Sequence, residues 1–226
     1  MLIKTNYIRM KYYLFSPKLK MWYIESYKEK NKNIKKIDHS YAVYPKRFYK
    51  NIDYNLQKSY DFCFIGSLYI DKQTFLNRKW ILPFIKNHFN KNSYLQFTDK
   101  KTKNIFKKEL GVFDYTHKKE GLVPKEVSID NRNFFDKEYF DNLTKSKFCL
   151  CPGGDKKYSM RFYECLMCKC IPIVENKEET YRSKDESKLG YKYYLSNSKE
   201  FIYKPEWAEY NYKLFLKYHT LEYVLK

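Results

Sequence analysis

The segment from Phe148 to Glu175 (FCLCPGGDKKYSMRFYECLMCKCIPIVE) contains residue types that could bind a phosphate group. Its pattern predicts a buried strand, a glycine-containing loop, a helix that begins at Ser159 and a second buried strand. Because Gly153 and Gly154 lack side chains, the loop backbone can approach a ligand closely. The free N–H groups and the dipole at the helix start favour an anion there. The segment therefore predicts an anion site.

Two charged side chains follow the predicted helix start. Arg161 lies in the first turn, where the helix dipole disfavours a cation unless that cation faces an anion such as a diphosphate. Glu164 lies one turn into the helix, where a carboxylate suits the two hydroxyls of a ribose. The alternative is a surface ion pair between the two side chains, worth about 0.2–0.5 kcal/mol. Together with the loop, the two residues favour a nucleotide site.

The same segment contains most of the cysteines of the chain. A C-x-C pair followed by C-x-x-C-x-C could bind a metal ion. The alternative is a packing role, because cysteine behaves as a small apolar residue in buried strands and on apolar helix faces. Zinc knuckles lie on glycine-rich turns, and these cysteines do not, so we favour packing and expect no metal. The cysteines concerned are Cys149, Cys151, Cys165, Cys168 and Cys170.

Buried strands alternate with helices from Asp61 onward, and this order predicts a doubly wound α/β fold with a mostly parallel sheet. Ligands bind such sheets at the carboxyl ends of strands, which points to Gly66-Ser67 and to Pro152–Ser159. Pro83 interrupts one predicted helix and should kink or split it. We expect strands at residues 62–67, 94–97, 148–151, 170–174 and 191–195, and helices at residues 72–89, 102–110, 136–147, 159–168 and 206–219.

Length and composition set the wider limits. A chain of 226 residues with 43% hydrophobic residues can form one or two domains with a real core. Residues 1–60 are rich in Tyr and Lys and show weak periodicity, so we separate them from a domain at residues 61–226. No window approaches 18 uncharged apolar residues and no secretory signal is visible, so we expect a cytoplasmic protein without a membrane span.

The formal net charge of +19 allows two interpretations. One is a polyanionic partner such as nucleic acid. The other is the amino-acid bias of an AT-rich genome, because the chain has 39 lysines but only six arginines, together with 25 tyrosines. Nucleic-acid-binding proteins use arginine heavily for its planar, forked side chain. We therefore favour genome bias and expect no nucleic-acid partner.

The segment from Ser146 to Val174, which contains the predicted anion site, resembles the exostosin-like glycosyltransferases (glycosyltransferase family 47). Their nucleotide-sugar-binding half carries a pattern like S-x-F-C-L-x-P-x-G followed by S-x-R-x-x-E-x-x-x-x-G-C-I-P-V-I. Phe64–Ser67, with Arg78 downstream, also looks like the first strand and helix of that half. Lys169 stands where the family has Gly, and Cys165 and Cys168 also depart from the pattern. The matching residues are Ser146, Phe148, Cys149, Leu150, Pro152, Gly154, Ser159, Arg161, Glu164, Cys170, Ile171, Pro172, Ile173 and Val174.

The resemblance implies a GT-B-like fold in which residues 1–60 form a reduced acceptor-side lobe and residues 61–226 form the Rossmann-type nucleotide-sugar-binding domain. It also implies inverting transfer of a sugar from a nucleotide donor, UDP-linked in our interpretation, to a glycan or protein-linked acceptor. The donor is a substrate, so no cofactor is expected. The chain contains no Asp-x-Asp metal motif. We therefore expect cationic side chains and a helix start, rather than a metal, to stabilise the leaving diphosphate.

The resemblance places the donor on the two strand ends and the helix start. Arg161, with Lys156 or Lys157, would stabilise the leaving group. The catalytic base stays unassigned among Glu25, Asp38, His39 and Asp53. The expected donor contacts are Gly66, Ser67, Arg78, Pro152, Gly153, Gly154, Lys157, Tyr158, Ser159, Arg161, Phe162 and Glu164.

Other classes of function remain open at the level of sequence. A non-catalytic nucleotide- or glycan-binding protein would keep the nucleotide half without transferring a sugar. A basic, Tyr-rich nucleic-acid-binding protein would use aromatic stacking and lysines. The AT-rich composition and the absence of a leader favour a virus- or microbe-encoded enzyme.

Overall fold

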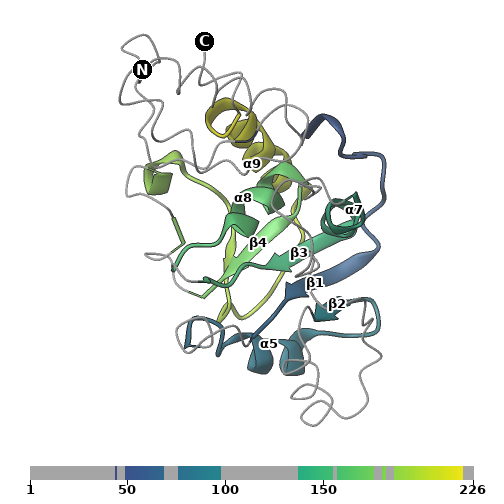
Figure 1. Cartoon of the computed structure of the whole chain (residues 1–226), viewed down its shortest axis with the longest axis vertical. Coiled ribbons are helices and arrows are strands. Elements are labelled where there is room, and N and C mark those ends of the chain that lie inside the picture. Colours follow the sequence, from purple (N-terminus) through teal and green to yellow (C-terminus); the bar gives the residue numbers. More distant parts are fainter. Residues whose placement is uncertain are drawn as a thin grey trace, which may run out of the picture.

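The computed structural model describes residue 44 and residues 49–68, 76–97, 137–154, 157–175, 180–181 and 186–220. Its centre is a five-stranded parallel sheet in the order β2-β1-β3-β4-β5 (Figure 1). This topology confirms the expected doubly wound α/β fold. The strands are β1 (Tyr60–Gly66), β2 (Tyr94–Phe97), β3 (Ser146–Leu150), β4 (Ile171–Val174) and β5 (Tyr194–Leu195).

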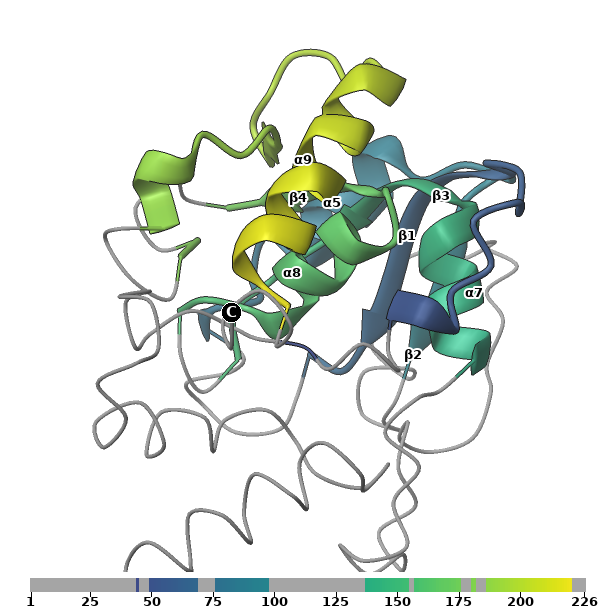
Figure 2. The same cartoon turned by 90° about the horizontal axis from the view of Figure 1, so that it is seen from above.

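Helices cover both faces of the sheet in three layers. Helix α5 lies on one face, α7 and α8 lie on the other, and α9 contributes side chains to the apolar clusters on both faces (Figures 1 and 2). Among the described residues, none of the helices combines the length and apolar character needed to cross a bilayer. The helices are α5 (Ile81–His88), α7 (Lys137–Lys145), α8 (Met160–Met167) and α9 (Pro205–Tyr218), with a short 3₁₀ helix, η3 (Glu186–Leu189).

The apolar run of β1 explains how one strand serves two cores. Cys63 and Ile65 pack into the cluster beneath α7, α8 and α9. Phe62 and Phe64 point to the opposite face and pack in the cluster that contains the α5 side chains. Because alternate side chains of a strand face opposite sides, a strand covered on both faces must be apolar at every position. The absence of alternation in the sequence therefore reflects the layered architecture.

The helix expected at residues 72–89 is shorter where it is described. Residues 77–80 form turns, and α5 begins only at Ile81. Pro83 therefore lies in the first turn of α5, where a missing backbone N–H removes no intrahelical hydrogen bond. The expected split is confirmed, but it occurs before the proline rather than at it.

Most other predicted elements agree with the structure within about two residues, the usual uncertainty of helix and strand ends. The 3₁₀ helix at Glu186–Leu189 was not expected. The helix expected at residues 102–110 lies outside the described residues. From the N-terminal segment, Tyr44 and Ile52 pack into the same cluster as α8 and α9. That residues 1–60 form a separate, reduced lobe stays a prediction.

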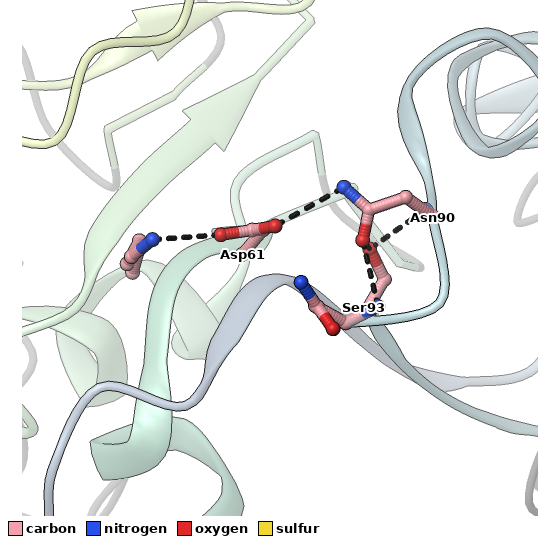
Figure 3. A network of polar contacts seen from close by, with 5 residues as sticks. Asp61, Asn90 and Ser93 are labelled. Carbon is pink, nitrogen blue, oxygen red and sulfur yellow. Dashed lines mark hydrogen bonds and ion pairs between the residues drawn. The ribbon is translucent and has the colours of Figure 1, made fainter.

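A polar network ties the amino ends of three strands together (Figure 3). Asp61 at the start of β1 accepts hydrogen bonds from Lys147 Nζ of β3 at 2.7 Å and from Asn90 Nδ2 at 3.1 Å. Asn90 belongs to the turn before β2, where it also bonds Ser93. The hydrogen bond from Lys147 lowers the pKa of Asp61. The network fixes the sheet at the edge opposite the carboxyl ends of the strands.

Candidate functional site

The candidate site lies where the direction of strand addition reverses. From β1 the chain first adds β2 on one side and then crosses back to place β3 on the other side. The crevice at such a switch point, beyond the carboxyl ends of the strands, is the usual ligand position in open α/β sheets. Gly66 ends β1 and Leu150 ends β3, so both face this crevice.

Helix α8 begins where the sequence predicts. Ser159 has extended backbone angles (φ −122°, ψ 133°), and its Oγ accepts a hydrogen bond from the Arg161 backbone N–H at 3.3 Å. This geometry is that of an N-cap residue. The expected start of the helix is confirmed, and the N-terminus of α8 opens toward the carboxyl end of β3.

The Arg161 side chain extends from α8 to the ends of β1 and β3. Its Nη1 donates to the Leu150 carbonyl at 3.5 Å, and its Cζ lies 5.6 Å from the centre of the Phe64 ring. A Cβ added to Gly66 would lie 3.4 Å from Arg161 Nη2 and 3.3 Å from the Phe64 ring. Glycine at position 66 therefore leaves room for the guanidinium. Within the described part of the chain, Arg161 makes no surface ion pair with Glu164.

Tyr139 of α7 connects the two charged residues of α8. Its hydroxyl accepts a hydrogen bond from Arg161 Nε at 3.4 Å and donates one to Glu164 Oε2 at 2.5 Å. Burial, followed by the negative charge of Glu164, raises the pKa of Tyr139, so the hydroxyl stays protonated and can donate. Burial alone would lower the pKa of Arg161, but neighbouring Tyr139 and Cys149 raise it, so the guanidinium stays charged.

Arg78 and Asn77 hold the glycine loop rather than projecting into open space. Arg78 Nε donates to the Gly153 carbonyl at 2.8 Å, and Arg78 Nη1 donates to the Ser67 carbonyl. Asn77 Nδ2 donates to the Gly154 carbonyl at 2.8 Å. These bonds connect the loop after β3 to the end of β1. The structure thus gives Arg78 a positioning role, and its expected contact with the donor stays a prediction.

A small cleft, partly open to solvent, lies beside this loop. Five predicted site residues line it, namely Pro152, Gly153, Lys157, Ser159 and Phe162. The other predicted site residues, Gly66, Ser67, Arg78, Gly154, Tyr158, Arg161 and Glu164, are not part of its lining. The remaining lining residues, which were not among the expected donor contacts, are Asn77, Trp80, Cys151, Val174, Glu175 and Thr180.

A cluster of buried thiols includes Cys151 of the cleft lining. The Sγ atoms of Cys149, Cys151 and Cys165 all lie within 4.8 Å of one another, a spacing compatible with a soft metal ion. Burial raises the pKa of Cys149 and Cys165. Burial acts the same way on Cys151, but hydrogen bonds with Cys149 and Cys165 and the charge of Arg161 outweigh it and lower the pKa of Cys151 to about 6. The cysteines are buried, as a packing role requires.

Comparison with known proteins now decides the family. The model of the Exostosin GT47 domain matches residues 38–204. The chain belongs to this family. No curated protein matches the chain. Among solved structures it is similar to a chain of the "Crystal structure of GtfA/B complex", with 11% identity and a TM-score of 0.45, covering 82% of this chain and 36% of that one. The chain therefore spans about a third of that chain's length.

One departure from the GT47 pattern has a local explanation. Lys169, which follows α8 where the family has Gly, has φ 52°, in the left-handed region that glycine adopts without strain. Its Nζ lies 2.7 Å from Glu209 Oε2 and 4.7 Å from the centre of the Tyr212 ring. These contacts with α9 hold the lysine side chain at this position.

Proposed function

We propose that this GT47 protein transfers a sugar from a UDP-linked donor to a hydroxyl of a glycan or protein-linked acceptor. Family membership supports glycosyl transfer. The observation that carries the proposal is Arg161. Its half-buried guanidinium lies beyond the ends of β1 and β3, and its contacts among the described residues are a hydroxyl, a carbonyl and a ring rather than a carboxylate. A diphosphate would supply the missing negative charge.

Charge stabilisation on the leaving group is the main chemical task of such a site. Negative charge on the diphosphate grows as the bond to the sugar breaks, and preorganised donors stabilise it. Arg161, Lys157 and the N-terminus of α8 are the groups that we propose for this task. The proposal includes inversion at the anomeric carbon and independence from divalent metal ions.

The ribose contact that we propose is the carboxylate of Glu164. Tyr139 fixes this carboxylate and the Arg161 side chain with the same hydroxyl, so the two donor-binding groups are oriented together. We leave the catalytic base unassigned. Of the four candidates, Glu25, Asp38 and His39 lie outside the described residues. Asp53 is exposed and accepts a hydrogen bond from the Asn55 backbone within its own turn.

Calorimetry with UDP tests the proposal. Arg161→Ala should weaken UDP binding by about 1.5–3 kcal/mol, the range for hydrogen bonds to charged groups. Lys204→Ala, which removes the lysine at the N-cap of α9 that contacts Trp207, is a matched control and should leave the affinity unchanged. An unchanged dissociation constant for Arg161→Ala would contradict the diphosphate contact. Single-stranded oligonucleotides should not bind, and UDP binding without sugar transfer would indicate a non-catalytic relative.

A further inference from the structure

Two neighbouring residues of the turn before α5 bind the carbonyl oxygens of the glycine loop. Arg78 Nε donates to the Gly153 carbonyl, and Asn77 Nδ2 donates to the Gly154 carbonyl, each at 2.8 Å. Arg78 Nη1 also donates to the Ser67 carbonyl at the end of β1. The planar guanidinium therefore bridges the loop after β3 and the end of β1, the two segments that meet at the switch point.

These hydrogen bonds also set the direction of a backbone N–H group. None of the described peptide bonds is cis, and in a planar trans peptide the C=O and the following N–H point in opposite directions. Because the Gly153 carbonyl points to Arg78, the N–H of Gly154 points away from it. This N–H donates to no residue that the structure describes.

The Gly154 N–H is accessible, and its surroundings favour an anion. Gly154 is half-buried, and a Cβ built on it would have one described neighbour within 4 Å, Arg78 Nη2 at 3.5 Å. The loop is therefore open on its other sides. A hydrogen bond from a charged group to a carbonyl polarises the peptide and makes its N–H a stronger donor. The positive charge of Arg78 thus acts on this N–H through the Gly153 carbonyl.

We infer that Asn77 and Arg78 are positioning residues for the donor diphosphate, because they hold the glycine loop with the Gly154 N–H directed outward to a phosphate oxygen. The inference rests on the proposed function and adds two residues that act on the donor through the loop. A loop that is fixed before the ligand arrives loses little conformational freedom on binding, and this favours affinity. Arg78 then has no need to contact the phosphate itself.

NMR of the wild-type protein tests this role at the loop itself. The sequence contains a single Gly-Gly pair, Gly153-Gly154, so labelling with ¹³C-carbonyl, ¹⁵N-glycine gives one HNCO signal. That signal joins the Gly153 carbonyl carbon to the Gly154 N–H. We expect inorganic diphosphate and UDP to move the amide proton downfield, as an accepted hydrogen bond does, and uridine to leave it in place. A proton that neither anion moves in a protein that binds both would overturn the inference.

Substitutions separate positioning from simple charge. Arg78→Lys keeps the positive charge but loses the fork that bridges two carbonyls, so it should weaken binding of inorganic diphosphate by about 10-fold or more. Asn77→Ala removes no charge and should weaken it roughly 3- to 10-fold, the range for one neutral hydrogen bond. Exposed Lys79 supplies the matched control, because Lys79→Ala removes a cation from the adjacent position and should leave the affinity unchanged.

The ligand-free variants show whether the loop contacts are those of the structure. Loss of the hydrogen bond in Arg78→Lys should move the Gly153 carbonyl carbon upfield, whereas Lys79→Ala should not move it. An Arg78→Lys variant that binds diphosphate as tightly as the wild type would overturn the positioning role. So would an Asn77→Ala variant with unchanged affinity. If the wild type binds neither UDP nor diphosphate while the carbonyl shift appears as expected, the proposed function fails and the loop contacts stand.

Discussion

Arg161 lies in the first turn of α8, where its charge opposes the helix dipole. The sequence shows this conflict, and the structure shows how it is eased: the side chain leaves the helix and reaches the Leu150 carbonyl at the end of β3. Tyr139, by contrast, has no motif around it. It lies on the buried face of α7 beside Phe140 and Leu143, where sequence cannot distinguish a tyrosine that organises a site from one that fills the core.

The link between Tyr139 and Glu164 leads to a first prediction. Glu164→Gln should weaken UDP binding more than binding of inorganic diphosphate, because ribose is the proposed partner of the carboxylate. Tyr139→Phe frees both Glu164 and Arg161 from their shared hydrogen-bond partner, so it should weaken binding of both ligands, of UDP by roughly 3- to 10-fold and of diphosphate by less. Calorimetry with both ligands measures this ratio. Equal losses for UDP and diphosphate would exclude the ribose contact.

The backbone at Lys169 leads to a second prediction. Lys169→Gly and Lys169→Ala both remove the contacts with Glu209 and Tyr212, but only glycine adopts φ 52° without strain. The glycine variant should therefore be more stable than the alanine variant by about 1 kcal/mol in urea unfolding. Lys213, exposed within α9, supplies the control. There the order should reverse, since glycine costs about 1 kcal/mol relative to alanine in a helix. An alanine variant that is more stable than the glycine variant at both positions would contradict the backbone strain at Lys169.

At the scale of elements, the strands and α8 were predictable because their signals are local. An unbroken apolar run and an N-cap serine need no knowledge of the rest of the chain. The cleft was not predictable, because its walls come from the residues before α5, the loop after β3 and the residues after β4. These segments meet only through the strand order, and the sequence does not state which strands are neighbours. Trp80 and Glu175 were therefore missed.

The amino-edge network leads to a prediction about pH. Lys147 lowers the pKa of Asp61 in the folded protein, so the stabilisation is present above about pH 4 and is lost as pH falls through the lowered pKa. Because both side chains are partly exposed, Asp61→Asn should cost at most about 1 kcal/mol at pH 7. Urea unfolding measures the free energy of unfolding of Asp61→Asn and of the wild type at pH 7 and pH 3. The difference between the two proteins should be smaller at pH 3. A difference that grows at pH 3 would contradict this assignment.

At the scale of the whole molecule, the interpretation of the net charge as genome bias stays a prediction. Residues 38–204 match a glycosyltransferase domain despite the net charge of +19. The charge comes from 39 lysines, whereas Arg161 and Arg78, two of only six arginines, both make contacts at the switch point. In an arginine-poor chain each arginine carries more information than a lysine, and these two lie at the candidate site.

The last prediction concerns metal ions. The thiols of Cys149, Cys151 and Cys165 are soft ligands, whereas the ions that neutralise diphosphates are hard and prefer oxygen. Burial raises the pKa of Cys149 and Cys165, which opposes the deprotonation that metal binding requires, whereas the pKa of Cys151 is lowered to about 6. The purified protein should therefore contain well below one zinc per chain by elemental analysis. Excess chelator should change neither its melting temperature nor its affinity for UDP, and sugar transfer on the correct donor should continue.

Stoichiometric zinc whose removal lowers the melting temperature would contradict the packing role of the cysteines. Activity that chelator abolishes and manganese restores would show instead that Arg161, Lys157 and the α8 start do not suffice to stabilise the leaving group.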